Sequence, residues 1–469
     1  MFTVPATVVF LAIAQPATQS APSRELDVRV DPRVELLSIV FRLAGNPEYN
    51  MDNSKSPYSD AVEAHFGHLR EHRAVKLARS LRRDRGISYD AVMSLAIHLD
   101  SDLSPPRPIM PLAPRPDLLE GRWREADAAR FIEALGDFVR DSDFHAFLAQ
   151  QRERYERCAT RLAAVVNQRD YVAWFDGFFG TRPQARFAVI VGMLCGGGNY
   201  GVSLRHADGR EEITPVLGVY RWDDAGVAVV GSEIGSTIVH ELCHAYTNAH
   251  VDRHEKELER PGRSIYARVA DVMRNQAYGN WKTMAYESLV RAVCVQYAYT
   301  VDGEGAGRKQ ALHELARGFK WTIELRGALR EYADDRATYP TFDDFMPRVV
   351  EVFERIARDY GALEAKFPRL VSTRPADGAN NVDPATRELV VVFDRPMIDK
   401  SWSITGGGPE MPKFGPPMFD DARTTLTVPM TLEPGRRYRF GLNGGSFYGF
   451  VSAEGYPLAS VEITFTTKK

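Results

Sequence analysis

The run His240-Glu241-Leu242-Cys243-His244 places two imidazoles four positions apart, with a carboxylate directly after the first. In a helix, positions i and i+4 lie one turn apart on one face, so both imidazoles can reach a single tetrahedral metal ion. Residues 234–249 read as such a helix, and a strand pattern ends just before it. The motif therefore predicts one zinc ion bound by His240 and His244, with Glu241 as the general base of a hydrolase.

A catalytic zinc site needs a third protein ligand and keeps its fourth position open. One candidate is His250, ten residues after His240, but it would require a sharp chain reversal where the sequence has no glycine. The other candidate is Glu287, which lies in an amphipathic segment with apolar and aromatic neighbours. Glu287 could instead form an ion pair with Arg291 on a solvent-exposed helix face and bind no metal. A buried carboxylate requires a partner, which favours Glu287, and His250 stays the alternative.

The periodicity of apolar residues divides the chain into a mixed part and an all-β part. Residues 26–168 and 232–366 have mainly helical spacing, and residues 368–469 have short β-branched runs between glycine- and proline-rich turns. Between the two helical stretches we expect a small sheet, with strands at residues 186–194, 199–204, 214–220 and 226–230. The last hundred residues have the pattern of a separate β-sandwich.

The charge balance limits the partners of this protein, and its N-terminus indicates export. The 59 basic and 62 acidic residues nearly cancel, which argues against nucleic acid or a membrane surface as the main partner. The apolar run 8–14, ending in Ala12-Ile13-Ala14, predicts a signal peptide over residues 1–21 and a periplasmic or extracellular location. No later segment approaches the ~20 apolar residues of a membrane span, so we expect no integral membrane segment in the mature chain.

Three segments, Gly197–Gly201, Ile238–His244 and Tyr286–Ala292, resemble a bacterial family of uncharacterised, predicted gluzincin-type metallopeptidases. The resemblance covers roughly residues 26–366 and implies a zinc peptidase fold with Glu287 as third ligand. Thermolysin-like gluzincins have an aspartate four residues after that glutamate, where this chain has Arg291, so the partner that orients His240 is left open. The C-terminal part resembles a bacterial Ig-like domain, an accessory module of exported proteins.

The expected fold is therefore α+β: a mostly helical zincin-like metallopeptidase domain with a small central sheet over residues 24–366, then an all-β Ig-like sandwich over residues 368–469. The expected function is hydrolysis of a peptide or protein substrate with one Zn²⁺ ion. Alternatives are a zinc hydrolase acting on a non-peptide amide or a cell-wall peptide, and an exported binding or adhesion protein with a structural or vestigial zinc. The sequence leaves open which group polarises the substrate carbonyl: Tyr200, Tyr278, Tyr286, Tyr297 or Arg291.

Overall fold

A computed structural model describes residues 25–51 and 55–469; the expected signal peptide lies outside this range. The elements before β2 are β1 (Asp27–Arg29), α1 (Pro32–Leu43), η1 (Pro47–Tyr49), α2 (Pro57–Phe66), η3 (Gly67–Leu69), α3 (Arg73–Arg85), α4 (Asp90–Ile97), α5 (Glu125–Asp141), α6 (Phe144–Val166) and α7 (Tyr171–Phe179). Three strands and then eight helices follow: β2 (Ala185–Gly192), β3 (Asn199–Arg205), β4 (Glu211–Gly218), α8 (Ile234–Arg253), α9 (Glu255–Arg274), α10 (Trp281–Tyr297), the π-helix η4 (Ala298–Asp302), α11 (Glu304–Ala316), α12 (Thr322–Asp334), α13 (Phe342–Arg358) and α14 (Tyr360–Glu364).

The central sheet has four strands in the order β1-β2-β4-β3. Strands β1, β2 and β4 are parallel, and β3 runs antiparallel to β4 at the edge of the sheet. β2 buries every side chain from Ala188 to its end, as expected of a parallel strand covered on both faces. The segment 226–230, expected to be a strand, forms only an isolated bridge between Ala228 and Trp222. The expected small sheet is present, and β1 supplies its fourth strand.

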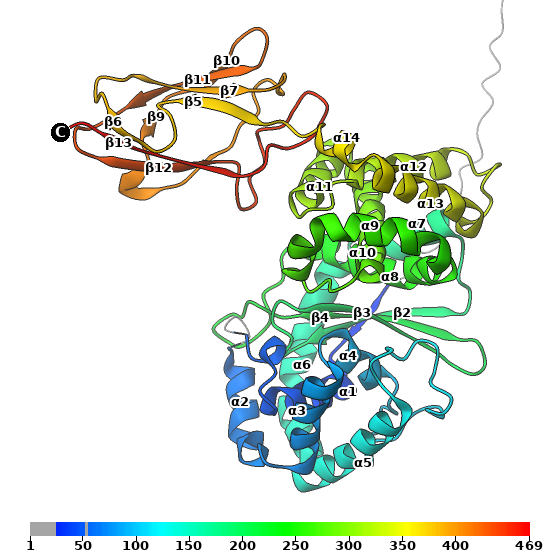
Figure 1. Cartoon of the computed structure of the whole chain (residues 1–469). Helices are drawn as coiled ribbons and strands as arrows, with labels where there is room; N and C mark the ends of the chain where they lie inside the picture. The colour runs from blue at the N-terminus through cyan, green and yellow to red at the C-terminus, as the bar shows by residue number, and fades with distance from the viewer. Residues whose placement is uncertain (1–24, 52–54) are drawn as a thin grey trace, which may run out of the picture.

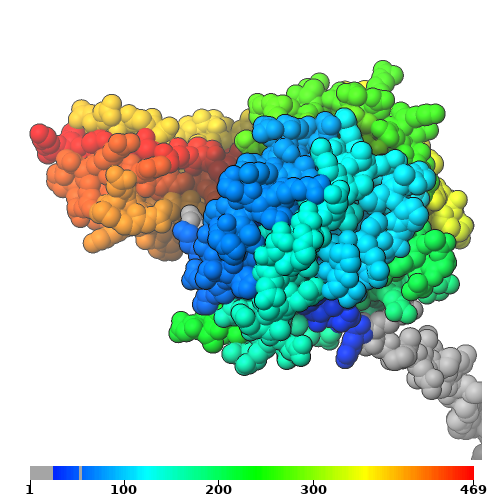
Figure 2. Space-filling model, turned by 90° about the horizontal axis from the view of Figure 1, so that it is seen from below, coloured from blue at the N-terminus to red at the C-terminus, as the bar shows by residue number. Residues whose placement is uncertain are grey.

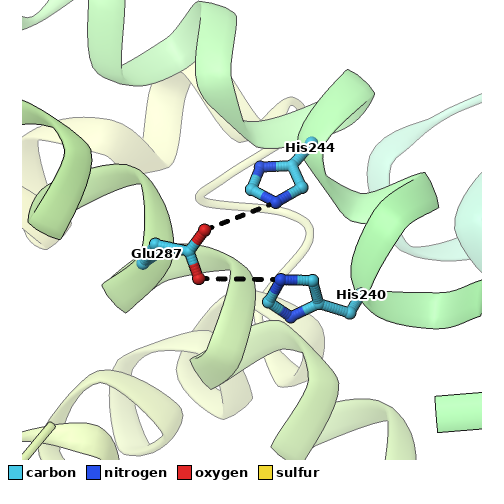
Figure 3. Close-up of side chains that lie close together, drawn as sticks. All are labelled: His240, His244 and Glu287. Carbon is cyan, nitrogen blue, oxygen red and sulfur yellow. Dashed lines mark ion pairs between the residues drawn. The ribbon is translucent and has the colours of Figure 1, made fainter. Parts of the chain in front are cut away.

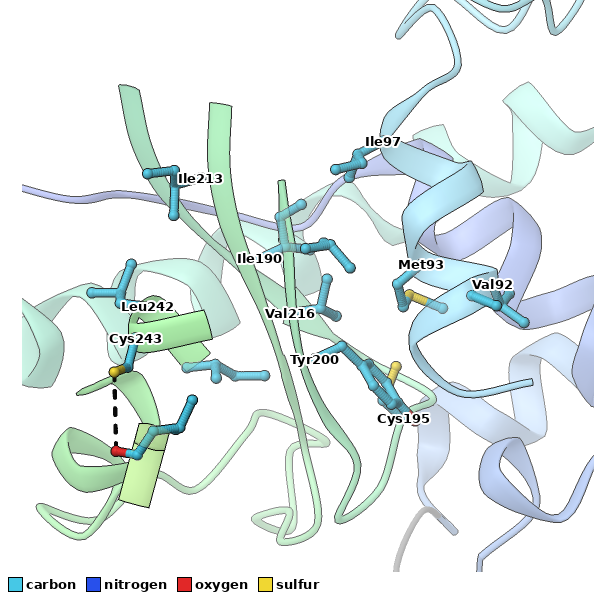
Figure 4. Packing of buried hydrophobic residues seen from close by; sticks show 14 of the residues in the cluster. Val92, Met93, Ile97, Ile190, Cys195, Tyr200, Ile213, Val216, Leu242 and Cys243 are labelled. Carbon is cyan, nitrogen blue, oxygen red and sulfur yellow. Dashed lines mark hydrogen bonds between the residues drawn. The ribbon is translucent and has the colours of Figure 1, made fainter. Parts of the chain in front are cut away.

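Helices cover both faces of this sheet. Helices α1 to α5 lie on one side and α7 to α14 on the other, and the long helix α6 extends from the first side past the sheet (Figure 1). Seen from below, the N-terminal helices form a continuous surface, coloured blue to cyan, with the C-terminal domain beside it (Figure 2). Met93 and Ile97 of α4 pack on one side of the strands, and Leu242 and Cys243 of α8 on the other (Figure 4). Helix α8 thus packs directly on one face of the sheet.

The C-terminal part is a β-sandwich with its own core. One sheet has the order β10-β11-β7-β5, with β9 also paired to β11, and the other has the order β6-β13-β12-β8. Its elements are β5 (Leu370–Arg374), β6 (Ala379–Val382), β7 (Glu388–Phe393), β8 (Ile404–Thr405), η5 (Gly408–Glu410), β9 (Lys413–Phe414), β10 (Met418–Phe419), β11 (Thr425–Thr431), β12 (Arg437–Leu442) and β13 (Val461–Thr467). The fold class is α+β, as the sequence predicts. Among the described residues, none of the helices is both long and apolar enough to span a membrane.

The core on the α1 side of the sheet contains an unusual carboxyl group. Glu35 is fully buried, accepts a 2.5 Å hydrogen bond from the Tyr58 hydroxyl, and lies 3.3 Å from the Met193 backbone N–H. Burial raises the pKa of Glu35 from 4.5 to about 8. This side chain is therefore protonated in the folded protein at neutral pH.

All four cysteines are free and buried.

Candidate metal centre

Two packed helices carry the candidate ligands. Helix α8 provides His240 and His244, and α10 provides Glu287. The Asn280 side chain caps the start of α10 by accepting a hydrogen bond from the Thr283 backbone N–H, which fixes where the helix begins. From Met284 to Tyr297 nearly every residue of α10 is buried, so this helix runs through the core and its glutamate is largely shielded from solvent.

The two imidazoles and the carboxylate face one another (Figure 3). The distance from His240 Nε2 to Glu287 Oε2 is 3.6 Å, and that from His244 Nε2 to Glu287 Oε1 is also 3.6 Å. One ligand atom from each of the three residues can be chosen so that all lie within 4.8 Å of one another. No other group of three or more such side chains occurs among residues 25–51 and 55–469.

The two imidazole–carboxylate distances, which end on different oxygens of Glu287, are close to the ligand spacing around a tetrahedral zinc ion. Ligand atoms that each lie 2.0–2.1 Å from one tetrahedral ion are about 3.3 Å apart, within a few tenths of an ångström of the two 3.6 Å distances. The donor set of two imidazoles and one carboxylate is that of a hydrolytic zinc site with one open position. The imidazole side chains keep 21% and 16% of their surface exposed, so the site is reachable from solvent.

Protonation states also suit a metal. Burial lowers the pKa of His240 to about 3, so its ring is neutral near pH 7. Burial raises the pKa of Glu287, but the nearby imidazoles and the Arg291 guanidinium lower it more strongly, to about 2. A neutral imidazole and an ionised carboxylate are the forms that bind a metal ion.

Glu241 lies beside the cluster and outside the ligand set. Burial raises its pKa to about 7, against the lowering effects of His244 and of a hydrogen bond from the Gly201 backbone. Gly201 belongs to β3, and a Cβ atom at this position would lie only 2.5 Å from the Glu241 backbone oxygen. The glycine therefore lets the edge strand approach α8 directly at the motif. A carboxylate with a pKa near 7 is suited to take up and release a proton at neutral pH.

A buried arginine holds the third ligand. Arg291 Nη2 donates to Glu287 Oε2 at 3.0 Å and to the Tyr278 hydroxyl at 2.8 Å, while Nη1 donates to Glu314 Oε2 at 2.6 Å. Its guanidinium lies 4.7 Å from the centre of the Phe319 ring. Arg291 and Glu314 are each only 3% exposed, so they form a buried ion pair that fixes the arginine next to Glu287.

His244 and His250 have different hydrogen-bond partners. His244 Nδ1 lies 3.3 Å from Asn248 Oδ1, one turn further along α8, which orients the ring with Nε2 toward Glu287. His250 lies outside the cluster: its Nδ1 is 2.6 Å from Asp343 Oδ1. The structure thus brings Glu287, and not His250, to the two imidazoles of the motif.

Of the tyrosines named from the sequence as carbonyl-polarising groups, only Tyr278 contacts the cluster, through Arg291 and Glu287. The Tyr286 hydroxyl donates to a carboxylate on α8. Tyr200 is buried on the α4 side of the sheet (Figure 4), and Tyr297 stacks on a tyrosine of α7. Arg291, the remaining candidate, is committed to its buried partners.

Three features of the site were not assigned from the sequence. Gly201 could have been found, because a glycine inside a strand pattern indicates close backbone approach. Asn248 could also have been found, since it follows His244 by one helical turn. Glu314 could not, because no spacing rule links it to Arg291, 23 residues earlier on another helix.

The chain combines an α+β domain bearing this centre with an Ig-like sandwich, and comparison with known families agrees with that division. Residues 119–352 match the model of a family described as a domain of unknown function (DUF4932), and residues 364–467 match the bacterial Ig-like domain. The chain thus contains a DUF4932 domain followed by a bacterial Ig-like domain. No curated protein matches it.

Matches among solved structures are weak. Two structures of a surface layer protein, SbsC domains 1-6 and the S-layer protein rSbsC, are each 16% identical with a TM-score of 0.18. Each alignment covers 54% of this chain and 35% of the S-layer chain, so the chain spans about a third of the length of those proteins.

Proposed function

We propose that this protein is a zinc-dependent hydrolase, and specifically a metallopeptidase. His240, His244 and Glu287 would hold one zinc ion, and Glu241 would act as general base. The observation that carries the proposal is the convergence of three ligand atoms beside a buried, non-ligand carboxylate whose pKa is about 7. A purely structural zinc site has no use for such a base, which argues against the binding-protein alternative.

The residues divide the chemistry between them. When bound, zinc lowers the pKa of water from 15.7 to about 7 and polarises a carbonyl oxygen. The Glu241 carboxylate accepts the proton from the attacking water and then delivers it to the nitrogen of the leaving amine. Arg291 keeps Glu287 ionised and in place throughout, because its charge is fixed and buried.

The edge strand β3 supports a peptide as substrate. β3 pairs only with β4, so its other edge is unpaired within the described sheet. Gly201 on this strand lies directly against the motif helix. An extended peptide that pairs with β3 would therefore pass beside Glu241, and main-chain hydrogen bonds of this kind are a common mode of peptide binding. The resemblance to predicted gluzincin-type peptidases supports the same substrate class.

The test is zinc content and peptide hydrolysis for the wild type and Glu241→Gln. We expect about one zinc per chain in both proteins, with hydrolysis reduced at least about a hundredfold in the variant. Glu233→Gln, an exposed position just before α8, serves as the matched control and should retain full activity. Equal hydrolysis by wild type and Glu241→Gln would show that this carboxylate is not the base. Full zinc content without hydrolysis in the wild type would favour the binding protein.

We also propose that the protein is exported. The bacterial Ig-like domain and the apolar N-terminal run of the sequence support this. Mass determination of the mature N-terminus in the producing bacterium should show cleavage within or just after residues 12–21. A mature chain that begins at Met1 would contradict export by this signal.

A further inference from the structure

The outer face of one sheet of the Ig-like domain carries an open polar depression, which we call the β12 depression. At its base, Gly441 of β12 pairs with Thr405 of β8 on one side and with Glu462 of β13 on the other. Side chains along β12 alternate between the sandwich core and solvent, and Arg439 and Gly441 belong to the solvent face. The depression has a volume of about 510 Å³, within the ~300–1,000 Å³ of ordinary ligand sites.

Charged side chains form part of its wall. Arg439 Nε and Nη2 both donate to Glu462 Oε2, at 2.8 and 2.7 Å. The Arg439 Nη1 and Glu462 Oε1 atoms take no part in this pair, and the two side chains keep 55% and 56% of their surface exposed. Glu410 also lines the depression. One guanidinium and two carboxylates are therefore present in a site that is open to solvent.

Small neutral groups form the rest of the lining. The Thr405 hydroxyl lies against the backbone of Gly441, where a Cβ atom would be only 2.5 Å away, and it donates to the Asn443 carbonyl oxygen at 3.3 Å. Ser460 adds a second hydroxyl, and residues 406–407, both glycine, add backbone groups that no side chain covers. Hydroxyl groups both donate and accept hydrogen bonds, so the depression suits a ligand whose groups do the same.

An exposed aromatic ring lies at the edge of the β12 depression. Phe447 keeps 65% of its surface exposed, and its backbone exchanges two 3.0 Å hydrogen bonds with Gly444. A Cβ atom at Gly444 would lie 3.5 Å from Thr405 Oγ1 and 4.0 Å from Ser460 Oγ, and both of these residues line the depression. The turn that presents the Phe447 ring therefore borders the depression.

This combination of groups suits a sugar. The edge of a sugar ring carries hydroxyls that donate and accept hydrogen bonds, and its faces carry apolar C–H groups. The ion pair of Arg439 and Glu462 offers a donor and an acceptor to neighbouring hydroxyls, and an aromatic ring such as Phe447 packs on a C–H face. Two carboxylates against one guanidinium leave the depression with a net negative charge, which disfavours anionic polysaccharides.

A protein partner fits the same lining less well. Apart from Val461 and Phe440, the residues that line the depression are polar or glycine, and the Phe440 ring is buried in the core of the sandwich. Protein interfaces are held mainly by large side chains that fill well-packed, desolvated pockets. An open polar depression provides no such pocket.

We propose that the β12 depression binds a neutral polysaccharide, with Arg439 and Glu462 bonded to its hydroxyls and Phe447 packed on a sugar ring. The site is independent of the metal centre, because all of its residues belong to the Ig-like domain and the candidate metal ligands belong to α8 and α10. The Ig-like domain thus anchors the chain to a glycan, whatever substrate the metal centre acts on.

The experiment is affinity electrophoresis of the full chain in native gels that each contain one soluble polysaccharide. The neutral ones are laminarin, arabinoxylan, dextran and glycol chitin, and the anionic one is polygalacturonate. We expect at least one neutral polysaccharide to retard the protein, which identifies the sugar, and polygalacturonate to leave its mobility unchanged. No retardation by any neutral polysaccharide, or retardation by polygalacturonate alone, would overturn the proposal.

Substitutions at exposed positions assign the binding to the depression. Phe447→Ala should raise the Kd for the retarding polysaccharide about tenfold, because the ring no longer covers apolar surface of the sugar. Arg439→Ala with Glu462→Ala should raise it about tenfold to a hundredfold, because hydrogen bonds to charged groups are lost. Both variants should unfold at the temperature of the wild type, since the substituted side chains are exposed.

Matched controls lie elsewhere in the same domain. Met418→Ala removes an apolar side chain that is 71% exposed on β10, in the other sheet. Arg436→Ala with Glu433→Ala removes a surface ion pair just before β12. Both controls should bind the polysaccharide as the wild type does. Wild-type affinity in the two depression variants, or an equal loss of affinity in the controls, would overturn the assignment of the site.

Discussion

The ion pair between Arg291 and Glu314 allows the centre to be perturbed without touching a candidate ligand. Both side chains are 3% exposed, so removing one alone would leave a buried charge unpaired, at a cost of about 3–5 kcal/mol. The double substitution Arg291→Met with Glu314→Leu removes both charges of this pair, and Glu287, which also loses its arginine partner, can take up a proton in the metal-free protein. Replacing a buried pair by apolar side chains of similar volume is often neutral or stabilising, so we expect the double variant to stay folded.

Zinc affinity should nevertheless fall in this variant. Glu287 loses the 3.0 Å hydrogen bond from Arg291 that orients its carboxylate toward the imidazoles, and keeps only the weaker contact from Tyr278. Loss of a partner that orients a ligand typically weakens metal binding tenfold to a hundredfold, which corresponds to about 1.4–2.7 kcal/mol.

Competition with a chromophoric zinc chelator measures this affinity, and thermal unfolding of the metal-free proteins measures stability. The matched control is Arg308→Met with Glu304→Leu, which removes an exposed i,i+4 pair from α11 and should change neither quantity by much. A folded Arg291→Met/Glu314→Leu protein with wild-type zinc affinity would refute the role given to the network.

Three further predictions concern single positions. Glu287→Ala should lose its zinc in dialysis against a mild chelator, whereas His250→Ala should keep it; the reverse would reassign the third ligand. Gly201→Ala should lower hydrolysis at least about tenfold, because its Cβ would clash with α8. The control Gly177→Ala places its Cβ in open space and should leave the rate of hydrolysis unchanged. For Glu35, the folded pKa of about 8 lies above 4.5, so the folded chain retains a proton that the unfolded chain releases. The free energy of unfolding of the wild type should therefore fall relative to that of Glu35→Gln as pH rises from about 5 to 8, by on the order of 3 kcal/mol; parallel curves in chemical denaturation would contradict this.

Elements with strong local signals were predictable from the sequence. The α+β class followed from the change between helical and strand periods, and strands β2, β3 and β4 fall within a few residues of the expected segments. β1 was missed because it is three residues long and pairs with β2 across the sequence, Asp27 opposite Ala188. Segment 226–230 was expected to be a strand from its apolar run, but it pairs only through one bridge, and its backbone bonds to residues 221–223 of its own turn.

The candidate site likewise contains residues that could be predicted from the sequence and residues that could not. His240, Glu241 and His244 are related by helix geometry alone, and the amphipathic pattern around Glu287 indicated a buried carboxylate. The partners that hold and surround these residues come from contacts between distant segments. Glu314 reaches the centre through the packing of α11 on α10, and such packing leaves no periodic trace in the sequence.

The central claim is that one zinc ion is bound by His240, His244 and Glu287. Its most direct test is a crystal structure of the zinc-loaded protein with anomalous diffraction recorded on both sides of the zinc absorption edge. We predict a single zinc peak about 2.0–2.2 Å from one atom of each of the three side chains. A zinc peak elsewhere in the molecule, or none in a crystal grown with equimolar zinc, would contradict the claim.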